Sequence, residues 1–300
     1  MSVAVVTDST AYLPSELLEG YGIHVVPLYV VLPGRSGREG VDVGPEDVAR
    51  ALSVRGQTVS TSRPTPGDFL AAYRHALDAG ADQLVSVHLS GELSGTSDAA
   101  RLAAAQVGEH IVTVVDSRSA AMGCGFPVLA AARCAADGAD RAEVAEAARR
   151  TAAETSTFFV VDTLEHLRRG GRIGAAAAVL GSALAVKPIL HVHDGRVVSL
   201  EKVRTTARAN SRLVQRAVEA AGDGPVSVAV HHLAAGERAE RLAAELRERL
   251  PALRELHVSE LGAAIGAHVG PGAVGVVVAP FWQGPDDRPD RPDGRGPAEE

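Results

Sequence analysis

The sequence predicts an α/β protein with two domains, and three observations support this fold class. Short runs rich in valine and isoleucine, typical of buried strands, alternate with alanine-rich helical segments along most of the 300 residues. Polar loops follow several strands of the first half, as at the ligand-binding edge of a parallel sheet. After residue 153 an Asp-Gly turn between extended runs indicates a hairpin. We therefore expect a βαβ-type parallel-sheet domain over 1–153 and a mixed-sheet α/β domain over 154–283.

The first domain is expected to alternate strands with helices. Its predicted strands are 2–6, 23–32, 83–88 and 111–115, and its predicted helices are 15–19, 45–52, 67–79, 98–106, 125–136 and 141–153. Prolines and glycines near 29–45 indicate a small hairpin-like insertion. Another strand starts at Thr58, and the prolines at 64 and 66 stop it, which leaves Thr61 and Ser62 in a stiff loop.

The second domain is expected to combine a hairpin with helices. Its predicted strands are 157–161, 189–193, 196–200, 226–230, 256–258 and 273–279, and its predicted helices are 164–169, 174–184, 206–221, 236–250 and 262–267. Residues 284–300 contain proline, glycine and charged residues with almost nothing apolar. Because such a segment cannot bury enough surface to become ordered, we expect a disordered tail over 284–300.

The composition argues against several classes of protein. A net charge of −7 and 3% aromatic residues disfavour nucleic-acid binding. No apolar window is long enough for a membrane span and no signal peptide is recognisable, so we expect no stable membrane insertion and a cytoplasmic location. Cys124 and Cys134 lack a Cys-x-x-Cys spacing and further ligands, so neither a disulfide nor a metal site is predicted.

The loop at 89–97 is the strongest candidate for a ligand site. It joins a predicted strand to a predicted helix and contains four hydroxyl residues around two glycines, namely Ser90, Ser94, Thr96 and Ser97 around Gly91 and Gly95. Hydroxyls and free backbone N–H groups at a helix N-terminus favour an oxyanion as the ligand. The alternative is that Ser94 or Thr96 only caps the helix.

Two nucleotide-binding patterns are absent. A P-loop requires four residues between its glycines and a following lysine, whereas Gly91 and Gly95 are separated by three residues and followed by Thr96. The segment at Gly123 lacks the third glycine of a dinucleotide fingerprint and carries Pro127. Nucleotide binding is therefore disfavoured, and no cofactor is predicted.

Several other polar residues admit more than one interpretation. Asp8 follows the first strand and either orients a hydroxyl or caps the next helix. His191 and His193 share one face of a strand, which is half of a metal site, but a satisfied or exposed pair is the alternative. His268 precedes Gly-Pro-Gly, where the backbone can approach a ligand closely.

Lysines are scarce in this chain. Only two of its 30 basic residues are lysines, Lys187 and Lys202, and they lie near each other. The pair marks either a place where a compact charge is needed or chance clustering.

Taken together, the motifs of this sequence resemble the DegV family. The resemblance covers residues 3–279 and rests on these segments in order: Thr7-Asp8-Ser9-Thr10, Thr61-Ser62-Arg63-Pro64, Leu93-Ser94-Gly95-Thr96, Val115-Asp116-Ser117, Thr163-Leu164, Arg169-Gly170-Gly171-Arg172-Ile173, Lys187-Pro188-Ile189-Leu190, Lys202-Val203-Arg204 and Gly266-Ala267-His268-Val269-Gly270-Pro271-Gly272-Ala273. It implies the two-domain DegV fold, which has a Rossmann-like N-terminal domain with a small insertion, a mixed-sheet C-terminal domain, and one long-chain fatty acid held between them.

The resemblance also implies a function and a set of site residues. Such proteins serve as the fatty-acid-binding, non-catalytic subunit of a bacterial fatty acid kinase and present the carboxylate to a separate kinase subunit, a step toward phospholipids. The positions matching the carboxylate site are Thr61, Ser94, Gly95 and His268. Arg172 and Arg204 match basic positions that present the acyl phosphate or dock the kinase. His88 and Ser97 depart from the usual pattern.

Two other functions remain open at this point. A dihydroxyacetone kinase domain shares the architecture and holds its substrate covalently on a histidine, a role that His268 or His231 could take. A lipid-buffering protein without a kinase partner is the second alternative.

Overall fold

The computed structural model describes residues 2–54, 56–179, 186–282 and 284. A parallel four-stranded sheet forms one half of this part of the chain, in the order β2-β1-β6-β7. Its strands are β1 (Val3–Asp8), β2 (His24–Val26), β6 (Gln83–His88) and β7 (Val112–Asp116). Because all pairs are parallel, the carboxyl ends of these strands lie at one edge of the sheet.

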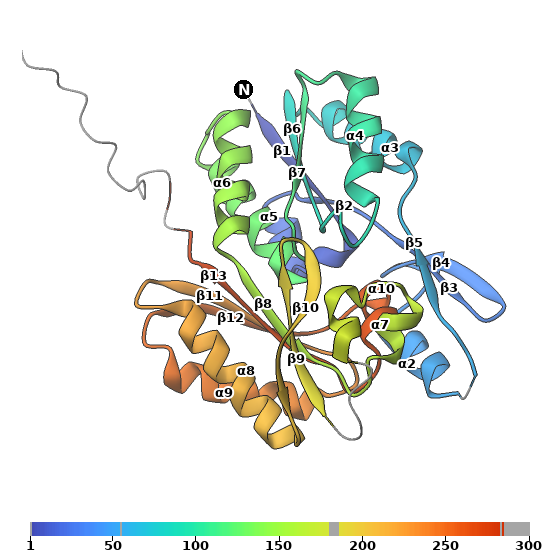
Figure 1. The fold of residues 1–300 in the computed structure, drawn as a ribbon. Coiled ribbons are helices and arrows are strands. Elements are labelled where there is room, and N and C mark those ends of the chain that lie inside the picture. The colour runs from blue at the N-terminus through green and yellow to red at the C-terminus, as the bar shows by residue number, and fades with distance from the viewer. Residues whose placement is uncertain (1, 55, 180–185, 283, 285–300) are drawn as a thin grey trace, which may run out of the picture.

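Helices cover both faces of the parallel sheet (Figure 1). The first half of the chain contributes the helices α1 (Ser15–Gly20), α3 (Pro66–Asp78), α4 (Thr96–Val107), α5 (Met122–Ala136) and α6 (Arg141–Glu154), and the short 3₁₀ helix η1 (Ser9–Ala11). Helices α3 and α4 pack in one core cluster, whereas α5 and α6 pack in another that also contains residues of β11 and β13. Helix α5 is therefore apolar nearly all round, as expected for a helix buried between two layers.

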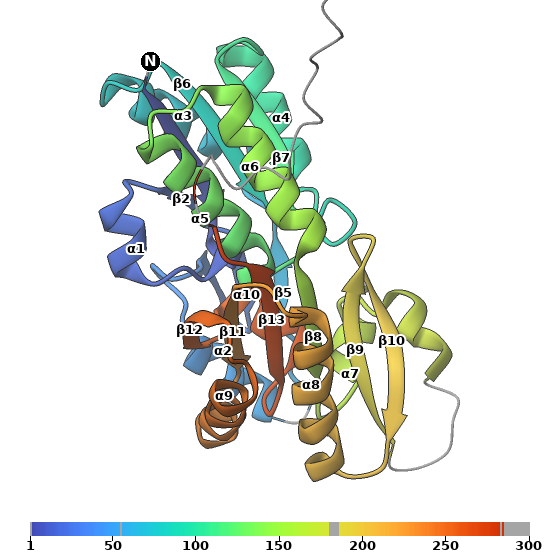
Figure 2. The same ribbon diagram turned by 90° about the vertical axis from the view of Figure 1, so that its left-hand side faces the viewer.

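A mixed six-stranded sheet forms the other half, in the order β10-β9-β8-β13-β11-β12. Its strands are β8 (Ser156–Val160), β9 (Lys187–His193), β10 (Arg196–Val203), β11 (Val226–His232), β12 (Leu253–Glu260) and β13 (Val274–Pro280). The hairpin β9–β10 lies at the edge (Figure 2). Helices α8 (Thr206–Ala221) and α9 (Gly236–Arg249) pack on this sheet through a shared aliphatic cluster.

A third, antiparallel sheet joins the two halves. It has the order β4-β3-β5, with β3 (Tyr29–Leu32), β4 (Arg35–Arg38) and β5 (Ser60–Ser62). This sheet and α2 (Pro45–Ser53) pack against α10 (Ala263–Val269) through one apolar cluster. Figure 1 shows these elements grouped with α7 (Glu165–Arg169) beside the mixed sheet. A segment from early in the sequence is thereby placed next to one from near residue 265.

The predicted fold class is confirmed, because a parallel sheet and a separate mixed sheet are present. The turn of the β9–β10 hairpin has φ of 49° at Asp194 and 78° at Gly195, as a type I′ turn requires. The predicted boundary at residue 153 falls at the end of α6 and stays a prediction. No described helix is long and apolar enough to cross a membrane.

Some predicted elements differ from the structure. Thr61 and Ser62 belong to strand β5 rather than a loop, because β3 supplies hydrogen-bonding partners. Strand β12 is longer than predicted because it pairs with β11 along its length. In the helix predicted over 174–184, Gly174–Val179 is 3₁₀ and the rest lies outside the described residues, as does the predicted tail apart from Gly284.

Candidate functional site

An apolar cavity lies between the loop that follows β6 and one face of the mixed sheet. It encloses about 1010 Å³ of empty space, including the part that is open to solvent. Its apolar wall includes Leu89, Leu93, Phe158, Phe159, Val192, Val197, Leu261, Ile265, Val274 and Val276. Side chains of β8, β9, β10, β13 and α10 thus form a long hydrophobic surface of the kind that accepts a small apolar ligand.

The polar residues of the cavity include four of the predicted site residues. Thr61 of β5, Ser94 of the loop before α4, Arg172 after α7 and His268 of α10 all line it. Thr61 Oγ1 lies 2.9 Å from His268 Nε2. Because α10 packs against β5, residues 207 positions apart in the sequence form a direct hydrogen bond. The structure therefore brings these four side chains into one site.

His268 is neutral at pH 7. Burial and the nearby Arg172 cation lower its pKa from 6.5 to about 4. Its Nδ1 is buried and has no hydrogen-bond partner among the described residues, and Gly170 lies against it. An unpaired buried N–H costs more than an unpaired lone pair, which favours the tautomer with the proton on Nε2. Nε2–H then donates to Thr61, whose own hydroxyl hydrogen is left to donate to a ligand.

Arg172 connects two of the loops that form the site. Its Nε donates to the carbonyl of Leu93 at 2.9 Å, and Nη1 donates to the carbonyl of Gly170 at 2.6 Å. Among the described residues it forms no ion pair with a carboxylate. The guanidinium therefore keeps its positive charge for an anion at this end of the cavity.

The capping interpretation of Ser94 and Thr96 is wrong. Helix α4 begins at Thr96, its N-cap is Gly95, and no side chain caps it. Ser94 Oγ instead lies 2.8 Å from Thr96 Oγ1, with Ser94 on the cavity wall. The Ser94 hydroxyl therefore faces the cavity, supported from behind by the buried Thr96 hydroxyl, and no side chain caps the N-terminus of α4, as the oxyanion interpretation requires.

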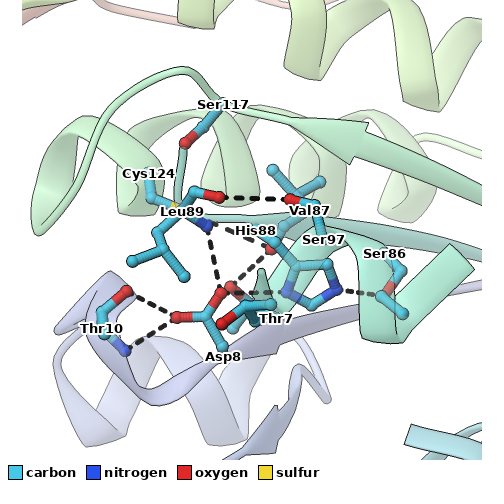
Figure 3. Close-up of polar contacts among 12 residues, drawn as sticks. Thr7, Asp8, Thr10, Ser86, Val87, His88, Leu89, Ser97, Ser117 and Cys124 are labelled. Atoms are coloured by element: carbon cyan, nitrogen blue, oxygen red, sulfur yellow. Dashed lines mark hydrogen bonds and ion pairs between the residues drawn. The ribbon is translucent and has the colours of Figure 1, made fainter. Parts of the chain in front are cut away.

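A buried network holds the start of this loop (Figure 3). Asp8 accepts hydrogen bonds from Thr10 N and Oγ1 through one oxygen, and from Leu89 N (3.1 Å) and His88 Nδ1 (3.0 Å) through the other. Ser86 Oγ lies 2.6 Å from His88 Nε2. Asp8 thus both orients a hydroxyl and caps a helix, and the capped helix is η1 rather than α1. His88, the departure noted above, completes the network beneath the loop.

Two predicted residues lie outside the cavity lining. Gly95 packs against Arg63: a Cβ there would overlap with the Nη1 of that guanidinium. Arg204 follows β10, is exposed to solvent, and is not part of the lining. Arg63 lines the cavity and was given no role by the sequence, because nothing local distinguishes it from other surface arginines.

The amino end of α10 is fixed by residues from the first 40 positions. Glu39 accepts a hydrogen bond from Ala264 N at 2.7 Å, and Tyr12 OH accepts one from Ile265 N at 3.2 Å. Tyr12 also donates to Glu39. Burial is the main reason why the pKa of Glu39 is raised. These contacts set the position of α10 and therefore of His268, and no sequence motif indicated them.

The other predicted features have structural explanations. The rings of His191 and His193 stack at 5.5 Å, and no group of three or more metal-ligating residues occurs in the described ranges. Lys187 forms an ion pair with Asp162 at 2.9 Å. Cys124 and Cys134 are buried and not joined in a disulfide.

His231 was considered in the sequence only as a possible covalent attachment site, and the structure shows that it lines the cavity and joins the two halves of the described chain. Its Nε2 accepts a hydrogen bond from Met122 N at 3.2 Å, at the start of α5. Only the neutral ring can do so, and burial lowers the pKa of His231 from 6.5 to about 4.

We expect His231→Gln to reduce the acid sensitivity of the protein. The unfolded chain binds a proton at His231 below about pH 6.5, whereas the folded chain does so only near pH 4, so stability falls as the pH decreases through this window. This difference amounts to roughly 3 kcal/mol, and glutamine can still accept from Met122 N. Denaturant unfolding at pH 7.5 and 4.5 measures the loss of unfolding free energy in each protein. An equal loss in the wild type and in His231→Gln would show that His231 is not the source of the acid sensitivity.

The described structure is that of an α/β protein with three sheets, an apolar cavity and a polar group of residues at one end of that cavity. The family model described as "Uncharacterised protein, DegV family" matches residues 2–280. The chain belongs to the DegV family.

Relatives and solved structures agree with this assignment. A DegV domain-containing protein of Streptomyces coelicolor is 54% identical over 277 residues, covering 92% of this chain and 98% of the relative. A DegV family protein from Thermus thermophilus, described as showing fatty acid binding, has a TM-score of 0.89 at 35% identity and covers 94% and 100% of the two chains. DegV from Bacillus subtilis, described as a fatty acid binding protein, has a TM-score of 0.85 at 34% identity and the same coverage.

Proposed function

We propose that this protein binds one long-chain fatty acid in the cavity. The observation that carries the proposal is that the long apolar wall meets a group of polar and cationic side chains at one end. Each buried methylene contributes about 0.8 kcal/mol, so a sixteen-carbon chain supplies on the order of 10 kcal/mol before the cost of binding. Related proteins described as fatty acid binding support the same ligand class.

The carboxylate then lies at the polar end. Thr61 and Ser94 supply hydroxyl donors, the backbone at Gly95 supplies the uncapped start of α4, and His268 orients Thr61. The fixed guanidinium of Arg172 supplies positive charge. Charge-assisted hydrogen bonds of this kind fix the orientation of a ligand whose affinity comes from its tail.

We further propose that the bound acid is presented to a separate kinase subunit. On that subunit a carboxylate oxygen attacks the γ-phosphorus of ATP, the bond to ADP breaks, and an acyl phosphate forms for phospholipid synthesis. In this scheme the present chain is a cytoplasmic, non-catalytic lipid-binding subunit without a cofactor. Arg172 contacts the phosphorylated head group, and the exposed Arg204 contributes to kinase docking.

Native mass spectrometry of the purified protein tests fatty acid binding directly. The expected result is one added mass of a long-chain fatty acid per chain, which is lost after delipidation and restored by palmitate. A delipidated protein that takes up no long-chain acid would refute the proposal.

Arg204→Ala is expected to separate binding from presentation. Because Arg204 is exposed and outside the cavity lining, fatty acid occupancy should remain at the wild-type level. Acyl-phosphate formation with the kinase subunit should fall several-fold, and raising the salt concentration should lower wild-type activity toward that of the variant. Arg254→Ala, on the distant strand β12, is the matched control. Parallel loss of lipid and phosphorylation would contradict a docking role.

The histidine environments favour binding over covalent catalysis. A histidine that forms a covalent substrate adduct needs an unoccupied nucleophilic nitrogen facing the substrate. Nε2 of His268 is bonded to Thr61, and its unbonded Nδ1 is buried against Gly170. Nε2 of His231 accepts from Met122 N, and its Nδ1 lies 3.1 Å from Ser259 Oγ. A dihydroxyacetone-kinase-like activity is therefore disfavoured. The assay of acyl-phosphate formation with the kinase subunit distinguishes a protein that presents the fatty acid to a kinase from one that only buffers lipid.

A further inference from the structure

Arg63 is a cation at the cavity with no anionic partner among the described residues. It follows β5, is exposed to solvent and contributes to the lining. Glu92, the acidic residue of the 89–97 loop, already forms an ion pair with Arg196 at 2.7 Å. The guanidinium of Arg63 is thus left available for a ligand.

Arg63 and Arg172 flank the same short stretch of backbone. Arg172 donates to the carbonyl of Leu93, and the guanidinium of Arg63 lies over the Cα of Gly95. Ser94 is the residue between them. Arg172 already uses Nε and Nη1 in bonds to two carbonyls, whereas Arg63 donates to no described group. An anion at Ser94 would therefore lie between the guanidinium of Arg172, which two carbonyls hold in place, and that of Arg63, whose N–H groups are free to bind it.

Arg63 occupies the space that a side chain at residue 95 would take. A Cβ at this position would overlap with Arg63 Nη1 and lie 3.2 Å from Cζ. The backbone itself accepts alanine, since φ at Gly95 is −74°. The absence of a side chain at residue 95 thus keeps the guanidinium beside Ser94.

We propose that Arg63 is a specificity residue that binds the phosphoryl group of the acyl phosphate at the cavity mouth. The proposal rests on the function proposed above. A carboxylate held by Thr61 and Ser94 places an added phosphoryl group farther toward solvent, where Arg63 lies. A phosphoryl group carries up to about two negative charges against one on the carboxylate, and a guanidinium binds its oxygens in a bidentate manner.

The test compares two ligands in competition binding to the delipidated full-length protein. One is palmitate, and the other is 2-oxoheptadecylphosphonate, in which a methylene group replaces the bridging oxygen of palmitoyl phosphate. Arg63→Gln is expected to lower the phosphonate-to-palmitate affinity ratio about tenfold, because it removes a charge-assisted contact that only the phosphoryl group makes. Arg63→Lys keeps the positive charge but loses the planar guanidinium that binds two oxygens at once, so it should lower the affinity ratio less.

Gly95→Ala tests the geometry with the charge retained. Gly95→Ala should lower the phosphonate-to-palmitate affinity ratio as Arg63→Gln does. The Arg63→Gln/Gly95→Ala double variant should have a ratio no lower than that of either single variant, since both substitutions remove the same contact. Arg101→Gln on the exposed side of α4 is the control and should leave the ratio unchanged. The proposal is overturned if Arg63→Gln or Gly95→Ala keeps the wild-type ratio while palmitate still binds. A wild-type protein that binds neither ligand would overturn the proposed function as well.

Discussion

His268→Ala is expected to lower the affinity for palmitate by about 10- to 100-fold at pH 7. His268 Nε2 lies 2.9 Å from Thr61 Oγ1, and when Nε2–H donates to Thr61 the hydroxyl hydrogen is left to donate to the proposed carboxylate. Loss of a hydrogen bond to a charged group costs about 1.5–3 kcal/mol, which corresponds to this range. Isothermal titration of delipidated protein with palmitate measures the effect.

Two controls separate this role from a general loss of structure. Thr61→Val should weaken binding by a similar factor, and the His268→Ala/Thr61→Val double variant should be only slightly weaker than either, because the pair acts as one unit. Chelator treatment of the wild type should change nothing if no metal is involved. If the losses of binding free energy caused by the two substitutions add fully, His268 does not act through the Thr61 hydroxyl.

Gly170→Ala is expected to weaken palmitate binding nearly as much as His268→Ala does. The backbone at Gly170 is helical with φ of −73°, so alanine fits the main chain. Its Cβ, however, would overlap with His268 Nδ1 and lie 2.8 Å from Cε1. The ring must therefore leave the position in which Nε2 bonds to Thr61, and affinity falls even though no polar group has been removed.

The neighbouring glycine provides a matched control for this experiment. Gly171 has φ of +70°, and a Cβ added there would meet nothing within 4 Å. Gly171→Ala should therefore lower the thermal midpoint through backbone strain, with little change in palmitate affinity. Gly170→Ala should show the larger loss of affinity. If both variants lose affinity equally, the effect comes from the loop conformation and not from His268.

Local sequence patterns predicted the elements well where the pattern is self-contained. The predicted bounds 83–88 and 206–221 match β6 and α8, because a run of β-branched residues and an amphipathic repeat are readable without their neighbours. Thr61 was placed in a loop because its strand depends on pairing with Val30 of β3. The length of β12 likewise depends on a partner strand rather than on its own residues.

The candidate site was predictable only in part, for a related reason. The hydroxyl loop at 89–97 is a local signal, and the resemblance to the DegV family supplied Thr61, His268 and Arg172. The Arg63 contact with Gly95 and the role of His231 depend on side chains that meet through tertiary structure. The spacing of residues along the sequence does not predict such contacts.

The attachment of α10 to the beginning of the chain has a consequence for biosynthesis. Ile265 bonds to Tyr12 across 253 positions, and Ala264 bonds to Glu39 across 225. Contacts of such long range form late in folding, since the intervening chain must first be brought together. During translation Thr61 emerges from the ribosome about 200 residues before His268. The polar end of the cavity is therefore incomplete until α10 has left the exit tunnel, and the proposed fatty acid binding requires the chain to be synthesised at least as far as His268.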